Sequence, residues 1–347
     1  GYWYYTRFEE GRQYPYYARK KGTTTNKEEI TLNVPELAKK HQIYLVRGWI
    51  VSNDNQHMAY GIDTSGNRRS ILYIKNLLSN ELHPDKIFNT SGNYVWANDN
   101  KTLYYVINDH TVRPYKVMKH ILGSAVNSDT EIYSEKDSTY AVGLSKSNNN
   151  RYIFIRSGTT NASEDRYLDA SNLSAAPVII QPRGNNIEYR ADHFEGDVFH
   201  IYTNKDAKNF KFVTAPLNNP GIEYWKDVMP ANDKAYLENA EVLKNYYVAQ
   251  TKENGLTQIK FFDRKNKKWN RVNFGQEDYV AQMYQATDDR SSDSIRYYFT
   301  SLSTPGSEYL YNLKTGEKKL LKQQKVETIL ILSYMKQKDY GQHQLTA

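Results

Sequence analysis

The residues that could act as a nucleophile are few in this chain. A serine nucleophile at a strand-to-helix turn needs the pattern G-x-S-x-G, because small neighbours let the serine project from a sharp bend. The sequence contains no such pattern, and the nearest approach is "VGLSKS", with Gly143, Ser145 and then Ser147 in place of the second glycine. It lies within an apolar alternation typical of a strand, so we interpret it as an ordinary strand end. With no cysteine in the chain, thiolate catalysis, disulfides and cysteine-based zinc sites are also excluded.

Histidines and paired acids are the other residue types that could carry chemistry. No histidine pair has the helical i, i+4 spacing of a zinc site, and we expect neither a metal nor a cofactor. In the strand pattern "VFHIY" we interpret His200 as a packed or hydrogen-bonded residue. Acidic pairs stand next to turns, where we expect solvated side chains. A glycosidase needs two carboxylates that converge in space, which a linear sequence cannot show, so that alternative stays open. The histidines are His41, His57, His83, His110, His120, His193, His200 and His343, and the acidic pairs are Glu9–Glu10, Glu28–Glu29 and Asp288–Asp289.

These residues stand on a repeat that fills most of the 347-residue chain. The segments "GWIVSNDNQHMAYGID" and "YVWANDNKTLYYVIND" spell one hairpin twice, and similar hairpins follow. Aligned on the turn residue, they are separated by 54, 45, 50, 46, 49 and 49 positions. Each continues with a third strand and a shorter outer strand, and four strands per 45–50 residues are typical of a propeller blade. The sequence therefore predicts an all-β, seven-bladed β-propeller of four-stranded antiparallel blades. The turn residues are Gly1, Asn55, Asn100, Asn150, Gly196, Asn245 and Ser294.

Two details of the predicted propeller concern its ends. Nothing precedes Gly1 to form the innermost strand of the first blade, which leaves an edge that other strands can pair with. The apolar segment Thr328–Tyr334 is one candidate to complete it. A single helix is predicted over Asn33–His41, with Asn33 as its cap and Pro35 in its first turn.

The charge of the chain does not indicate a nucleic-acid partner. The net charge is +7, but 46 Lys and Arg residues are interleaved with 39 acids. The densest basic cluster, "DRKNKKWNR" over Asp263–Arg271, is interpreted as a solvated loop, and no basic stripe or known fold supports nucleic-acid binding. No run of about 18 apolar residues is present, so we expect no membrane partner.

Several long segments carry a more specific resemblance. They are "GYWYYTRFEEGRQYPYYARKKG", "TSGNYVWANDNKTLYYV", "RPYKVMKHILG", "TNKDAKNFKF" and "ENGLTQIKFFD". From Gly1 to about Val326 the chain resembles the N-terminal β-propeller of the prolyl oligopeptidase family, and within it oligopeptidase B, also called protease II. The resemblance implies an α/β-hydrolase domain with a Ser-Asp-His triad after the propeller, a propeller that admits only short peptides, and cleavage after Arg or Lys. No catalytic residue of the family matches a position here.

The tail departs from that family. Residues 1–326 are assigned to the propeller and 327–347 to a tail that does not match the family's linker. Read in another frame with permitted codons, "YMKQKDYGQHQLTA" over Tyr334–Ala347 gives "YETKRLWATPTDG", which does match. This predicts a frameshift near residue 326 and no α/β-hydrolase domain on this chain.

Charged turns after the second strand of a blade are candidate docking residues, because such turns gather on one side of a propeller. They are "DTSGNRR" (Asp63–Arg69), "TNKDAKNF" (Thr203–Phe210) and "TKENG" (Thr251–Gly255). Arg68, Arg69, Lys205 and Lys208 are predicted to orient a partner domain, with solubility of the turns as the alternative.

The function predicted for this chain is therefore non-catalytic. It would be the substrate-gating propeller of a serine peptidase that cleaves short peptides after Arg or Lys, with that peptidase's hydrolase domain as partner. A stand-alone interaction scaffold is the alternative. The compartment is left open between cytoplasm and periplasm, since relatives occur in both.

Overall fold

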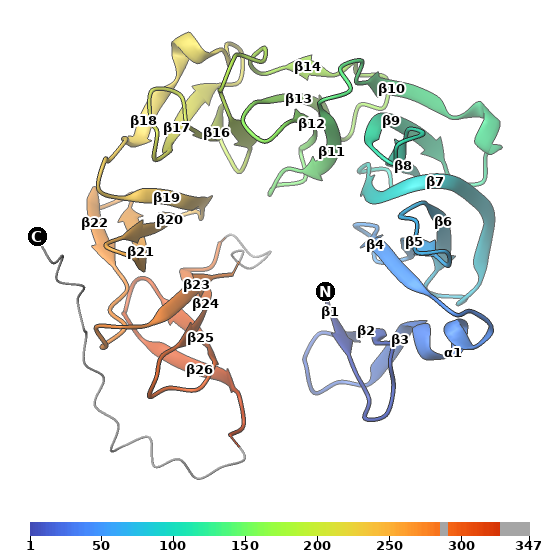
Figure 1. Cartoon of the computed structure of the whole chain (residues 1–347), viewed down its shortest axis with the longest axis horizontal. Coiled ribbons are helices and arrows are strands. Elements are labelled where there is room, and N and C mark those ends of the chain that lie inside the picture. The colour runs from blue at the N-terminus through green and yellow to red at the C-terminus, as the bar shows by residue number, and fades with distance from the viewer. Residues whose placement is uncertain (285–290, 327–347) are drawn as a thin grey trace, which may run out of the picture. The chain divides into compact units, whose positions relative to one another are not determined.

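The structure, a computed structural model, describes residues 1–284 and 291–326 of the chain (Figure 1). The chain divides into two compact units, Gly1–Asn186 and Ile187–Ala347. The regular secondary structure of the described residues is almost entirely β in both units. The helical elements are one four-residue α-helix and three 3-10 turns: α1 (Val34–Leu37), η1 (Ala38–Lys40), η2 (Val126–Ser128) and η3 (Ile222–Tyr224).

The first unit contains three antiparallel sheets. One has three strands in the order β1-β2-β3, one has seven in the order β10-β9-β8-β7-β6-β5-β4, and one has four in the order β11-β12-β13-β14. Their strands are β1 (Tyr2–Arg7), β2 (Tyr16–Lys21), β3 (Glu28–Asn33), β4 (Leu45–Val51), β5 (His57–Asp63), β6 (Ser70–Asn76), β7 (Leu82–Trp96), β8 (Thr102–Asn108), β9 (Pro114–Ile121), β10 (Thr130–Ser134), β11 (Ala141–Lys146), β12 (Tyr152–Gly158), β13 (Ser163–Asp169) and β14 (Val178–Ile179).

The second unit contains three sheets of four strands each, every one with its strands in chain order. Their strands are β15 (Tyr189–Asp192), β16 (Val198–Thr203), β17 (Lys211–Pro216), β18 (Lys226–Met229), β19 (Tyr236–Val242), β20 (Tyr246–Glu253), β21 (Leu256–Asp263), β22 (Lys268–Arg271), β23 (Val280–Met283), β24 (Ser294–Thr300), β25 (Ser307–Asn312) and β26 (Lys318–Gln323).

The all-β propeller class is confirmed, but the predicted count of seven four-stranded blades is wrong. Five sheets in the described part of the chain have the four or more strands of a blade, and the first sheet has three. The main cause is β7, a continuous strand of 15 residues. Its first part pairs with β6, up to Thr90. Thr90 is also the first residue that pairs with β8, and this pairing continues from Tyr94 after a shift in register. The two groups of strands on either side of β7 therefore belong to one sheet.

A pair of glycines allows β7 to bend where it passes from one partner to the other. Gly92 has φ +92, and a Cβ atom on it would lie 2.3 Å from the carbonyl oxygen of Arg47. Gly48, on β4, has φ +76, and its Cβ atom would lie 1.8 Å from the Gly92 oxygen. Both the left-handed backbone and the close approach require glycine. The "TSGN" segment, which resembles a turn between two strands, is thus a bend within one strand.

The core is divided among neighbouring sheets within each unit. Central strands such as β8 are buried on both faces, which explains why nearly all of their residues are apolar or aromatic. In the first unit, Val106 and Ile153 belong to one buried cluster that joins the seven-stranded sheet to the next sheet. In the second unit, Phe261 and Tyr297 join the last two sheets in the same way. Each sheet is therefore stabilised by apolar surface that it shares with a neighbour.

The repeated turns also connect neighbouring strand groups through hydrogen bonds. Asn55, Asn100 and Asn150 have φ values of 62, 58 and 61, a left-handed conformation that asparagine tolerates well. The side-chain amide of Asn53 donates to Asn98 Oδ1 at 3.1 Å, and the side-chain amide of Asn98 donates to the backbone carbonyl of Asn150 at 2.9 Å. The period of 45 to 50 residues thus places copies of one turn side by side.

The predicted helix is shorter than expected. Helix α1 begins after Asn33, whose Oδ1 accepts a hydrogen bond from the Glu36 amide at 3.1 Å, and it continues into η1. The cap and the proline in the first turn are confirmed. Residues Thr328–Tyr334, the candidate strand for the first sheet, and the tail 327–347 lie outside the described residues.

Candidate functional site

The serine nearest to a nucleophile pattern lies in a hairpin. Ser145 is part of β11, which pairs with β12 and ends at Lys146. The hydroxyl of Ser147 closes the following turn, accepting a hydrogen bond from the Tyr152 amide at 2.9 Å and donating to Asn149 Oδ1 at 2.8 Å. No helix follows this strand, so the interpretation of an ordinary strand end is confirmed.

The described histidines and acids form no metal site, since no group of three or more such side chains in residues 1–284 and 291–326 could hold an ion. His200 is packed, as predicted, with its ring stacked on Phe212 at a centroid distance of 6.0 Å. Burial, followed by the charge of Arg264, lowers the pKa of His200 to about 4. It is therefore neutral in the folded protein.

The acidic pairs have structural partners. Glu28 accepts hydrogen bonds from Arg7 and from the Tyr5 hydroxyl at 2.6 Å, and Glu29 pairs with the buried Arg19 at 2.8 Å. Glu9 pairs with Arg7. The pair Asp288–Asp289 lies outside the described residues.

The turn between β5 and β6 is organised by one buried carboxylate. Asp63 accepts hydrogen bonds from the backbone amides of Ser65, Gly66 and Arg68 at 2.8–3.0 Å. Although burial opposes ionisation, these bonds lower the pKa of Asp63. The two predicted docking residues, Arg68 and Arg69, lie at the end of this turn, and their side chains differ in their contacts.

Arg69 is engaged inside the first unit. Its guanidinium donates to Asn89 Oδ1 at 2.5 Å and to the His110 carbonyl at 2.7 Å. Arg68, which has φ 64, is exposed, and its guanidinium makes no hydrogen bond or ion pair with any described residue. Of the two, Arg68 is therefore the side chain available to a partner.

The turn between β16 and β17 carries the other two predicted docking residues. Lys205 pairs with Asp206 at 2.8 Å, and Lys208 pairs with Asp233 at 3.4 Å through side chains that are 74% and 86% exposed. Exposed pairs of this kind contribute about 0–1 kcal/mol each. They leave both lysines able to exchange partners. The arginines and the lysines lie in different units, and the docking role of all four stays a prediction.

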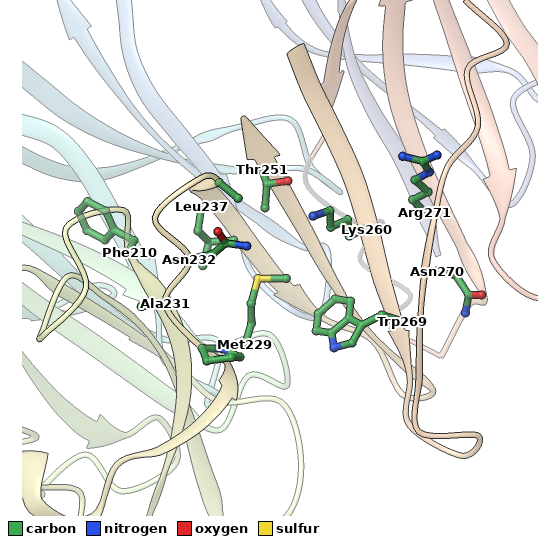
Figure 2. Close-up of a pocket in the computed structure, with 12 residues that line it drawn as sticks. Phe210, Met229, Ala231, Asn232, Leu237, Thr251, Lys260, Trp269, Asn270 and Arg271 are labelled. Carbon is green, nitrogen blue, oxygen red and sulfur yellow. The ribbon is translucent and has the colours of Figure 1, made fainter. Parts of the chain in front are cut away.

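This second turn borders a pocket in the second unit (Figure 2). The pocket has a volume of about 420 Å³. Its walls come from the end of the β16–β17 turn, from the connection between β18 and β19, and from one face of the sheet that contains β20, β21 and β22. Trp269 lies across from Met229 in Figure 2. The lining residues are Phe210, Met229, Pro230, Ala231, Asn232, Ala235, Leu237, Thr251, Lys260, Trp269, Asn270 and Arg271.

The pocket corrects the interpretation of the basic cluster Asp263–Arg271. Only its middle part, residues 264–267, is a loop, because Asp263 ends β21 and Lys268–Arg271 forms β22. Trp269 and Arg271 lie two positions apart on this strand and share one face of the sheet. In the sequence, Trp269 and Arg271 stand in a lysine-rich segment and do not indicate a pocket. The opposite wall is formed by Met229 and Asn232, which lie about forty residues earlier in the chain.

A buried charged cluster in the first unit was also missed. Glu135 is 5% exposed and accepts hydrogen bonds from Arg183 at 2.7 Å, from Tyr133 at 2.7 Å and from the Ser157 hydroxyl. Burial raises its pKa, but these bonds outweigh burial and lower the pKa of Glu135 to about 2. Arg183 also pairs with Glu164. Glu135 and Arg183 are 48 positions apart, so nothing local in the sequence indicates the pair.

Comparison with known proteins shows which family this fold represents. The family profile described as "Prolyl oligopeptidase, N-terminal beta-propeller domain" matches residues 1–324. The chain belongs to the prolyl oligopeptidase family. The resemblance seen in the sequence is thus confirmed, and protease 2 and oligopeptidase B are among the relatives of this family member.

Individual relatives match along nearly the whole chain. Dipeptidyl aminopeptidase BI of Pseudoxanthomonas mexicana is 34% identical over 350 residues, covering 94% of this chain and 47% of that protein. Protease 2 of Moraxella lacunata is 30% identical, covering 92% and 46%. The structure of oligopeptidase B from Leishmania major has a TM-score of 0.86 at 23% identity, which establishes the shared fold, and covers 93% and 47%.

This family member therefore spans about half the length of these relatives. The family consists of serine peptidases, and its propeller is separate from its catalytic domain. Within the described part of the chain, no helix has the length and apolar character needed to cross a bilayer.

Proposed function

We propose that this chain is the substrate-gating propeller of an oligopeptidase B-like serine peptidase. The observation that carries the proposal is the propeller-domain match over residues 1–324, on a chain that spans about half of its relatives and contains no G-x-S-x-G. The propeller is assigned to residues 1–326. Chemistry would come from an α/β-hydrolase domain that the propeller covers.

Gating by a propeller rests on size. A folded protein cannot enter a narrow passage or a cleft between domains, whereas an extended short peptide can. The proposed specificity for cleavage after Arg or Lys follows from the oligopeptidase B resemblance. It is supported by the likeness to protease 2 at 30% identity. The proposed substrates of the intact enzyme are thus short peptides, cleaved after Arg or Lys.

The docking of the hydrolase domain is proposed to use the turns after the second strands. Arg68 is the best placed residue, because it is exposed and its guanidinium makes no hydrogen bond or ion pair with any described residue. Lys205 and Lys208 each form an ion pair, with Asp206 and Asp233. Arg69 would act indirectly, by fixing the turn that presents Arg68.

An activity measurement tests the non-catalytic assignment. The purified 347-residue chain is incubated with an arginyl p-nitroanilide peptide, before and after treatment with a reagent that traps active-site serines. We expect no release of p-nitroaniline above buffer in either case. Turnover that co-purifies with the chain through successive columns would overturn the assignment.

A further inference from the structure

The pocket of the second unit joins an apolar wall to a pair of cations. Phe210, Met229, Leu237 and Trp269 supply large apolar side chains, while Lys260 and Arg271 supply the charge (Figure 2). None of the described residues that line it is acidic. Its volume of about 420 Å³ falls within the range of small-molecule sites, which are mostly apolar with a few polar groups.

The two cations are direct cross-strand neighbours. Lys260 on β21 is opposite Arg271 on β22 in an antiparallel ladder, so both side chains lie on the same face of the sheet. Like charges at opposite positions are destabilising. Trp269 pairs with Phe262 in the same ladder, and their rings lie 5.3 Å apart. The charged pair thus adjoins an aromatic pair on one surface.

Of the two cations, Lys260 alone forms an ion pair with a residue in the described part of the chain. Lys260 forms an ion pair with Glu253. Burial opposes ionisation of Glu253, but hydrogen bonds from Lys260 and the Thr251 hydroxyl outweigh it and lower the pKa of that carboxyl. Arg271 is exposed, and its guanidinium makes no hydrogen bond or ion pair with the residues that the structure describes. The charge of Arg271 also helps to lower the pKa of Glu253, but that carboxylate is paired with Lys260, so the Arg271 guanidinium has no directly paired anion among the described residues.

We propose that this pocket binds a small organic anion, with an aromatic or branched apolar body and one acidic group. The apolar body lies between Trp269 and Met229, and the acidic group pairs with the Arg271 guanidinium. A planar guanidinium suits a carboxylate or sulfonate, because it can donate two parallel hydrogen bonds. Binding would relieve the repulsion between Lys260 and Arg271. This site lies within the second unit and does not depend on the proposed peptidase function.

The test uses 8-anilinonaphthalene-1-sulfonate, a fluorescent anion with an aromatic body, titrated into the folded 347-residue chain. We expect saturable binding that weakens as salt is added, because one charge pair supports it. In Arg271→Gln the affinity should fall at least fivefold and the salt dependence should disappear. Neutral N-phenyl-1-naphthylamine, which lacks the sulfonate, should bind the wild type and the variant equally.

Lys268→Gln is the matched control. Lys268 is an exposed cation of the same strand, on the opposite face from Arg271, and it does not line the pocket. Its loss changes the net charge equally and should leave the affinity unchanged. The proposal is overturned if no saturable binding occurs, or if Arg271→Gln and Lys268→Gln weaken it to the same extent.

Discussion

The buried His200 should determine how the second unit responds to acid. The residue is 3% exposed, its ring stacks on Phe212, and the Tyr247 ring lies 5.8 Å away. Neither ring nitrogen has a hydrogen-bond partner among the described residues. Burial, with a smaller contribution from Arg264, lowers its pKa from 6.5 to about 4.

The direction of the effect follows from proton linkage. Because the pKa of His200 is lower in the folded state, a proton binds the unfolded chain first as the pH falls. The stability that the neutral His200 contributes to the folded state is complete above about pH 6.5 and is lost between pH 6.5 and pH 4. The difference between the unfolded and folded pKa values of His200 corresponds to about 3 kcal/mol in the free energy of unfolding. About 2 kcal/mol of this is lost between pH 7.5 and pH 5.

Substitution His200→Phe keeps an aromatic ring in this site and removes the titration. Urea unfolding at pH 7.5 and pH 5, followed by tryptophan emission, gives the free energy of unfolding of each protein. We expect the wild type to lose about 2 kcal/mol more than the variant over this interval. Carboxylates that titrate in the same range contribute equally to both and cancel in the comparison.

The control is His110→Phe, a substitution at an exposed histidine of the first unit. Its free energy of unfolding should follow that of the wild type at both pH values. If wild type and His200→Phe lose stability in parallel, His200 is not a neutral buried group and the reasoning is refuted.

Four further substitutions test the fold. Gly92→Ala should lower the free energy of unfolding by more than about 2 kcal/mol, because its Cβ would lie 2.3 Å from a backbone oxygen and its φ is +92. A change below about 0.5 kcal/mol would contradict the bend in β7. Trp96→Ala should cost about 3–5 kcal/mol, since Trp96 is 1% exposed, and calorimetry would show it. Arg69→Met should cost about 1 kcal/mol and Arg68→Met almost nothing in urea unfolding, because of the two side chains only that of Arg69 bonds to described residues, Asn89 and His110. Equal effects would argue against this difference.

Local features of the fold were predictable from the sequence. The turn residues Asn55, Asn100 and Asn150 all have the left-handed conformation that asparagine in such turns indicates. The Asn33 cap and the strand character of Ser145 also follow from short-range rules. Each of these depends on a few consecutive residues, so the sequence contains the needed information.

The number of blades was not predictable, because it depends on which strands share a ladder. The segment "TSGN" has the composition of a turn, but the close approach of Gly48 and Gly92 makes it a bend within β7. Strand pairing is a tertiary property here. A count of repeats cannot tell two sheets from one sheet that shares a strand.

The candidate site residues also divide into features that the sequence predicts and features that only the fold shows. Arg68 and Arg69 were both predicted from composition, yet only the fold shows that Arg69 is held by Asn89 and His110. The pocket depends on a tertiary neighbour of β22. Long-range pairs of this kind follow from the fold and leave no local pattern in the sequence.

We propose that this propeller gates a catalytic domain encoded beside it. Sequencing the coding DNA on both sides of this segment tests that claim most directly. We predict that the DNA after codon 326, in one of its reading frames, encodes an α/β-hydrolase domain with a G-x-S-x-G nucleophile turn. Flanking DNA that encodes no such domain in any frame would contradict the account.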